Sequence, residues 1–108
     1  MPFYKPAKDP VIPITDPLHS LPRVPIAVDA WFPTGKKTKP KIIQFKIKDN
    51  DSNIVTISQI TTLFCEQSYY YGSSVLEFRC EIVYLYQKKN VIIYFFPRDL
   101  RWELSFIP

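Results

Sequence analysis

Few side chains in this sequence of 108 residues are of the types that catalyse reactions or bind metals. His19 is the only histidine, in a proline-rich segment that does not fix its position, and we interpret it as a surface residue. Cys65 and Cys80 are the only cysteines, and without a second pair or a neighbouring histidine they lack the ligands that a zinc site needs. We therefore predict no catalytic residues, no metal site and no cofactor.

The segment Gly35–Thr38 contains the Gly-Lys pair that ends a phosphate-binding loop. The full loop also needs a glycine at position 30 and a serine or threonine directly after Lys36, and the sequence has Ala30 and Lys37 there. No helix start follows the segment. It is therefore not predicted to bind nucleotide phosphates.

Glu77 and Glu81 form another candidate pair, because two nearby carboxylates can act as general acid and general base. On a strand they share one face with Arg79 between them, and the predicted neighbouring strand places Glu66 opposite. A solvated ladder of alternating charges explains this arrangement without catalysis. The chain is therefore not predicted to be an enzyme.

The net charge of +4 has its excess concentrated in one segment. Six lysines stand there with no acidic residue among them: Lys36, Lys37, Lys39, Lys41, Lys46 and Lys48. One interpretation is a solvated edge strand that the lysines protect from unwanted pairing. The other is a surface that attracts phosphate groups, with Tyr69, Tyr70 and Tyr71 at a predicted hairpin end stacking on nucleic-acid bases.

The sequence carries no sign of a secretory signal or of a membrane span. The N-terminal region is interrupted by prolines, and the longest apolar run, 91–97, has the length of a strand. Two cysteines in such a chain are expected to be reduced thiols. We therefore predict a cytoplasmic protein without a membrane partner.

Prolines divide the chain into two unlike parts. Seven of the eleven prolines fall in the first 25 residues, and their recurrence from Met1 to about Arg23 excludes helix interiors and central strands in that segment. We predict an extended arm over residues 1–23, followed by one domain over residues 24–108. The arm also carries apolar residues that need a surface to lie on: Phe3, Tyr4, Val11, Ile12, Ile14, Leu18 and Leu21.

From Val24 onward, apolar and polar residues alternate as in strands with one buried face. We predict six strands, at about 24–32, 41–48, 54–66, 74–86, 91–97 and 101–107. Because short turn segments connect them, the simplest topology is an antiparallel up-and-down meander. The predicted fold class is all-β, a meander curled into a small barrel that is complete or incomplete.

The turns predict which residues face each other across the hairpins. A turn at Gly72-Ser73 would set Cys65 opposite Cys80, and a loop tip at Arg98-Asp99 would set Phe95 opposite Trp102. A loop at 50–52 would set Ile47 opposite Val55 and Phe45 opposite Ile57. One face then collects the residues expected in the core: Ile26, Val28, Ala30, Phe32, Ile43, Phe45, Ile47, Val55, Ile57, Leu63, Cys65, Leu76, Phe78, Cys80, Ile82, Tyr84, Val91, Ile93, Phe95, Trp102, Leu104 and Phe106.

An alternative interpretation makes residues 58–67 a helix capped by Ser58. Ile60, Leu63 and Phe64 would then share one stripe. The β-branched run from Ile60 to Thr62 favours a strand instead. If the helix formed, the fold would be a sheet with one helix packed on it.

The opposite face of the predicted sheet is polar in part but also carries a contiguous apolar patch, which is too large to be accidental. Its members are Trp31, Ile60, Phe64, Val83, Leu85, Ile92, Tyr94 and Phe96. The arm of the same chain, a second subunit, or a ligand or partner protein are three alternatives for what covers it.

These features predict a non-enzymatic structural or protein-interaction module. It would associate with itself through the arm and the apolar patch, as a homo-oligomer, or bind an unidentified protein partner. The alternative function is a small barrel that binds single-stranded nucleic acid. The residues for that function would be Lys36, Lys37, Lys39 and Lys41, from the lysine segment 36–48, and Tyr69, Tyr70 and Tyr71.

Overall fold

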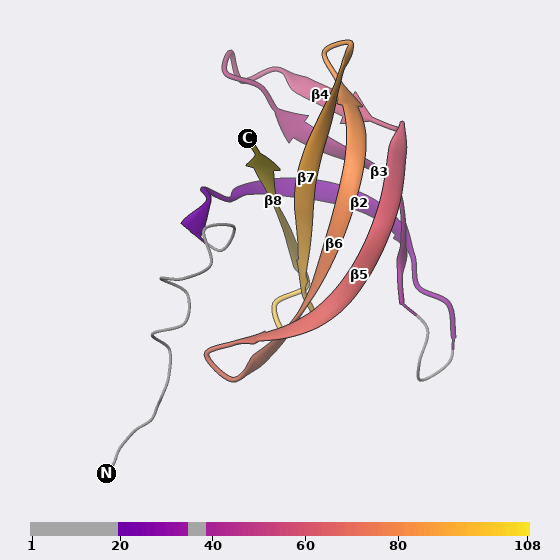
Figure 1. Cartoon of the computed structure of the whole chain (residues 1–108), viewed down its shortest axis with the longest axis vertical. Helices are drawn as coiled ribbons and strands as arrows, with labels where there is room; N and C mark the ends of the chain where they lie inside the picture. The colour runs from indigo at the N-terminus through magenta and orange to yellow at the C-terminus, as the bar shows by residue number, and fades with distance from the viewer. Residues whose placement is uncertain (1–19, 35–38) are drawn as a thin grey trace.

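Seven strands make up most of the chain in the computed structural model, which describes residues 20–34 and 39–108 (Figure 1). Their bounds are β2 (Val24–Trp31), β3 (Lys41–Lys48), β4 (Ile54–Ile57), β5 (Ile60–Tyr70), β6 (Ser73–Tyr84), β7 (Gln87–Phe96) and β8 (Arg101–Ile107). Most of the predicted arm, with His19, lies outside the described residues, as do Lys36 and Lys37. Within the described ranges the chain contains no α-helix, and the all-β prediction is confirmed.

The strands form one antiparallel sheet in the order β4-β3-β2-β8-β7-β6-β5, curled into a half-barrel. Except for β4 and β5, consecutive strands pair as the meander predicts, and the first described strand also pairs with the last, through Val24 opposite Leu104 and Ile26 opposite Trp102. In Figure 1, β2 crosses behind β6 and β7, so the two ends of the sheet enclose a common interior. The barrel remains open between its edge strands, β4 and β5.

The predicted strand 54–66 is in fact two strands, interrupted at Ser58 and Gln59. Its first part pairs with β3, and its second part pairs with β6. The Gln59 carbonyl accepts a hydrogen bond from the Val83 backbone N–H at 3.2 Å, so the chain passes from one partner to the other without a helix. The alternative of a helix over 58–67 is wrong, because the β-branched run there pairs as a strand.

Two of the three predicted hairpin registers are confirmed. Phe95 faces Trp102, and Ile47 faces Val55. The third hairpin turns one residue earlier than predicted, at Tyr71-Gly72, so Cys65 faces Phe78 rather than Cys80. Both turn residues have positive φ, 52° and 81°, which is the geometry of a type I′ turn, and glycine adopts it readily in the second position.

Two β-bulges displace residues that the alternation assigned to the core. The β2–β3 ladder steps from Asp29 opposite Gln44 to Ala30 opposite Ile42, which leaves Ile43 as the extra residue. The β5–β6 ladder has a similar step that leaves Leu63 as the extra residue. Ile43 and Leu63 are therefore 48% and 61% exposed, and Ile42 and Ile60 face the interior in their place.

The interior is filled from both ends of the curled sheet. Its fully enclosed members are Ile42, Phe45, Ile47, Ile57, Phe78, Cys80, Ile82, Val91, Ile93, Phe95 and Leu104. Trp102 packs its ring against Phe95 and Phe78, with ring centroids 4.5 Å and 5.9 Å away. Phe32, although half exposed, lies edge-on to Phe95 at 5.4 Å and so belongs to the same aromatic group. Apart from the two bulge positions and from Phe32 and Phe106, which are 52% and 37% exposed, the residues of the predicted core face point inward.

The β6–β7 turn holds two residues with large side chains in a left-handed backbone conformation that is unfavourable for them. Leu85 and Tyr86 both have positive φ, 52° and 66°, and both side chains are exposed. Left-handed backbone is unfavourable for large side chains, and type I′ turns prefer Asn-Gly at these two positions. We expect the double substitution Leu85→Asn, Tyr86→Gly to raise the free energy of unfolding by about 1–2 kcal/mol, measured by urea denaturation.

The matched control for this turn is Gly72→Ala, which is expected to change stability in the opposite direction. Gly72 has the same left-handed backbone with no atom near its Cβ position, so added strain alone would act there. An unchanged or reduced stability of the β6–β7 double variant would contradict the assignment of strain to Leu85 and Tyr86.

Candidate interaction edge

The centre of the predicted apolar patch is covered rather than exposed. Ile92, Tyr94 and Phe96 lie on the outer face of β7, where they form a second buried cluster with Val75 of β6. Tyr70 of β5 packs against this cluster, with its ring centroid 6.5 Å from that of Tyr94. These residues therefore do not offer an open docking surface.

Arg23, directly before β2, is one of the residues that lie over this cluster. Its guanidinium carbon lies 5.6, 5.3 and 5.7 Å from the ring centroids of Tyr70, Tyr94 and Phe96, respectively. Its Nε also lies 3.3 Å from a carboxylate oxygen of Glu103. The neighbouring Pro22 carbonyl accepts a hydrogen bond from the Ser105 hydroxyl at 2.9 Å. The last residues of the predicted arm are thus attached to the outer face of the strands β7 and β8.

The other members of the predicted patch do not share one surface. Ile60 was expected on the outer face, but the bulge at Leu63 turns it towards the main core. Trp31, Phe64 and Leu85 are exposed, at the end of β2, in the middle of β5 and in the β6–β7 turn, respectively. The contiguous patch that alternation predicts is therefore divided by the bulge and by burial at its centre.

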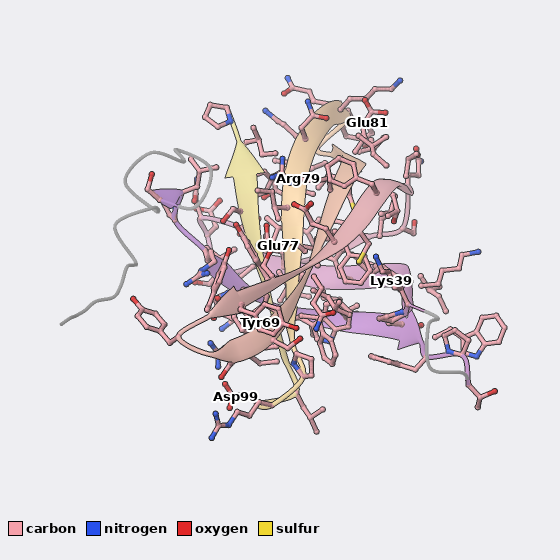
Figure 2. All side chains as sticks on the ribbon, turned by 60° about the horizontal axis from the view of Figure 1, so that its bottom comes forward. Lys39, Tyr69, Glu77, Arg79, Glu81 and Asp99 are labelled. Atoms are coloured by element: carbon pink, nitrogen blue, oxygen red, sulfur yellow. The ribbon has the colours of Figure 1, made fainter. Side chains whose placement is uncertain are left out.

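The predicted solvated ladder of charges is also partly buried. Glu77, Arg79 and Glu81 follow one another along β6, as Figure 2 shows, but Glu77 is 0% exposed. The Tyr70 hydroxyl donates a hydrogen bond to Glu77 Oε2 at 2.9 Å. Burial raises the pKa of Tyr70 well above the usual value for tyrosine, and the nearby Glu77 carboxylate raises it further. Burial likewise raises the pKa of Tyr94.

The two cysteines are free thiols on the interior side of β5 and β6. Cys80 is buried, with its Sγ 3.7 Å from the Thr62 hydroxyl, and Cys65 is half-buried. Burial raises the pKa of both thiols above the usual value for cysteine, which lowers their reactivity. Residues 20–34 and 39–108 contain no group of three or more His, Cys, Asp or Glu side chains that could hold a metal ion.

Lys39, from the lysine segment, contacts β5, the strand that leads into the tyrosine hairpin. Lys39 Nζ donates a hydrogen bond to the backbone carbonyl of Cys65, in the middle of β5, at 2.7 Å. Tyr69, near the end of β5, is 68% exposed, and Tyr71 in the turn is fully exposed, whereas Tyr70 points to Glu77. Lys41 is exposed at the start of β3. Among the described candidates for nucleic-acid contact, Lys39, Lys41, Tyr69 and Tyr71 are exposed, and Tyr70 is not. Lys39 and Tyr69 both lie along β5.

That edge is the most distinctive surface of the described residues. We use the name β5 edge for the side of β5 that faces away from β6, where the sheet ends. β5 has eleven residues, whereas β4 at the opposite edge has four. Seven residues of β5 are exposed: Thr61, Thr62, Leu63, Phe64, Glu66, Gln67 and Tyr69. It contains no proline, and Glu66 is its one charged residue.

Sequence reasoning did not identify the β5 edge, because the predicted strand 54–66 had neighbours on both sides. The available signal was the pair Ser58-Gln59, two polar residues that interrupt an otherwise apolar and β-branched run. A strand that changes partner at such a break leaves one side of each half unpaired. Phe64, predicted in the patch, is the one member of that patch that lies on this strand and remains exposed.

Comparisons with protein families, with curated proteins and with solved structures found no match to this chain. Among the described residues, no helix is long and apolar enough to cross a membrane.

Proposed function

We propose that this chain is a non-enzymatic protein-interaction module that docks an extended polypeptide segment on the β5 edge. One observation carries this proposal: an eleven-residue strand ends the sheet, and hydrophobic side chains stand exposed along it. An edge strand presents a row of backbone donors and acceptors to a new strand. Most proteins protect such an edge with charges, prolines or short length.

The side chains of the edge suit the same function. Leu63 is 61% exposed and Phe64 is half exposed, next to each other in the middle of the strand. A docked strand would cover both side chains while its backbone pairs with β5. The Arg79 guanidinium lies 5.6 Å from the centroid of the Phe64 ring and makes a cation–π contact with it. Leu63 and the rest of the Phe64 ring remain available to an apolar side chain of the partner.

A random-peptide phage library tests the proposal with the full chain as bait. We expect selected peptides to bind the wild type and to shift the backbone amide signals of residues 65–69 in NMR spectra. Tyr69→Lys places a charge on the edge and should weaken their binding about tenfold or more. The matched control is Ile54→Lys on β4, the other edge strand, where the side chain is also exposed. Peptides that bind both variants equally, or an absence of binders, would contradict the proposal.

Binding of single-stranded nucleic acid is the second candidate function, and one placement favours it. Lys39 contacts β5 at Cys65, and Tyr69 follows four residues later on the same strand. At about 3.3 Å per residue, the two lie roughly 13 Å apart along the strand. A cation and an exposed aromatic ring along one strand are the two kinds of group that bind the phosphates and the bases of a single-stranded nucleic acid.

Fluorescence anisotropy with short single-stranded DNA and RNA tests this candidate at low salt, where phosphate contacts are strongest. The double variant Tyr69→Ala, Tyr71→Ala should weaken binding about tenfold or more, since stacking on each ring contributes about 1–3 kcal/mol. Tyr86→Ala is the matched control, because this exposed tyrosine lies in a different turn. An absence of binding at low salt would exclude the candidate.

A further inference from the structure

The backbone groups that β5 directs away from β6 can be assigned from its hairpin. Tyr70 and Ser73 flank the two-residue turn, and such a flanking pair exchanges both of its backbone hydrogen bonds. Alternate residues then point the other way, so the N–H and C=O groups of Gln67 and Tyr69 face outward. The Lys39 ammonium confirms this alternation, because it binds the carbonyl of Cys65, two residues before Gln67.

We propose that the occupant of the β5 edge is a second copy of this chain, paired antiparallel about a two-fold axis at Ser68. This inference rests on the proposed function and names its partner. In this register Gln67 lies opposite Tyr69 of the second copy, and Tyr69 lies opposite its Gln67. Each pair consists of outward-facing residues and can exchange two backbone hydrogen bonds. The same surface patch serves both subunits, as a two-fold interface requires.

The charge of β5 is compatible with a second copy as the occupant. Glu66 is the one charged residue of β5, and in this register it lies opposite Tyr70 of the second copy rather than opposite its own equivalent. Like charges directly opposite each other would destabilise the pair, and this arrangement keeps them apart. The exposed ring of Tyr69 lies beside Gln67 of the second copy, so each subunit covers aromatic surface of the other.

The hydrogen bond of Lys39 argues against the two-fold register whose axis lies at Gln67. An axis at Gln67 would pair Cys65 with Tyr69 of the second copy and would need the Cys65 carbonyl as an acceptor. That carbonyl already accepts a hydrogen bond from Lys39 at 2.7 Å. The axis at Ser68 uses only residues between Cys65 and the turn, so the existing hydrogen bond is kept.

Cysteine cross-linking of the full chain tests the register. Ser68→Cys places two thiols across the axis at a non-hydrogen-bonded pair, where the Cα atoms are about 4.5 Å apart, within the range that a disulfide spans. Under mild oxidation we expect Ser68→Cys to form a covalent dimer. Glu66→Cys, on the same face of the same strand, is the matched control and should remain monomeric on a non-reducing gel. The wild type controls for its native thiols, Cys65 and Cys80.

Light scattering over micromolar to submillimolar concentrations measures the association itself. We expect the wild type to reach twice its mass of 12.7 kDa, and Tyr69→Lys to raise the dissociation constant about tenfold or more. At concentrations where both chains are monomeric, their thermal stabilities should be equal. A dimer that cross-links through Glu66→Cys, or that Tyr69→Lys leaves intact, would overturn this register. A wild type that stays monomeric would overturn the second copy as occupant. If that monomer still binds peptides, the proposed function is supported without the dimer. If it binds no peptide, both the proposed function and the dimer are contradicted.

Discussion

Ile42→Ala is expected to lower the free energy of unfolding by about 2–5 kcal/mol, whereas Ile43→Ala is expected to lower it by less than about 1 kcal/mol. The two residues are adjacent and identical in type, but Ile42 is 6% exposed within the main core and Ile43 is 48% exposed. Truncation of Ile42 removes buried methyl groups and leaves a cavity among packed side chains. Urea denaturation followed by circular dichroism measures both changes.

This pair of variants is its own control, since both substitutions remove the same atoms from the same strand. Equal losses would mean that Ile43 is also enclosed, and a larger loss at Ile43 would place the bulge elsewhere in β3. The second result would mean that Ile43, Phe45 and Ile47 alternate regularly on the inward face, with no bulge at Ile43. The experiment therefore tests the position of the bulge in β3.

The bulge at Ile43 shows where the alternation of apolar and polar residues no longer predicts which side chains are buried. In β6, β7 and β8 the strict period of two predicts the interior face, and Phe78, Ile93 and Leu104 are buried there as expected. In β3 and β5 an extra residue shifts the period, and Ile43 and Leu63 become exposed. A bulge adds no unusual residue type in either place, so hydrophobic pattern alone does not locate it.

The turn residues predicted the register of a hairpin correctly where the sequence allows only one turn. The loop tip at Arg98-Asp99 gives the β7–β8 register, and Phe95 faces Trp102 as predicted. Gly72 was predicted to open a turn with Ser73, yet it closes a turn with Tyr71. A glycine satisfies either geometry, since it adopts positive φ in the first or the second turn position. The error is two residues in register, which preserves the face of each side chain. The misplacement of Leu63 in β5 comes from the bulge and not from the turn.

The candidate site was less accessible to sequence reasoning than the core. Leu63 was predicted in the core and Phe64 in the apolar patch of the opposite face, but the bulge exposes Leu63, and β5 becomes an edge because the chain changes partner at Ser58 and Gln59. Likewise, Glu77 read as a surface carboxylate because it alternates with apolar residues, yet it is buried, opposite Tyr94 and with the Tyr70 hydroxyl donating to it. In both cases the burial of the side chains depends on which other elements cover that face of the sheet, and the residue pattern along one strand does not predict this.

Tyr70→Phe is expected to lower the free energy of unfolding by about 1–3 kcal/mol near neutral pH. The substitution keeps the ring that packs against Tyr94 and removes the hydroxyl that donates to Glu77 at 2.9 Å. A buried carboxyl that loses a donor loses part of the compensation for its removal from water. Urea denaturation of the variant and of the wild type measures the difference. An unchanged stability would mean that this hydrogen bond contributes nothing.

The same variant is expected to change how stability depends on pH, and the sign follows from the raised pKa of Tyr70. Below about pH 10 the phenol is protonated in both folded and unfolded chains, so its contribution is complete. Above that pH the unfolded chain releases the proton while the folded chain keeps it, so the wild type loses about 1.4 kcal/mol per pH unit from this group. Tyr70→Phe lacks the group and should decline less steeply between about pH 10 and pH 11. Tyr69→Phe, with an exposed side chain on the same strand, should follow the wild type, and parallel curves for Tyr70→Phe and the wild type would contradict the burial of this hydroxyl.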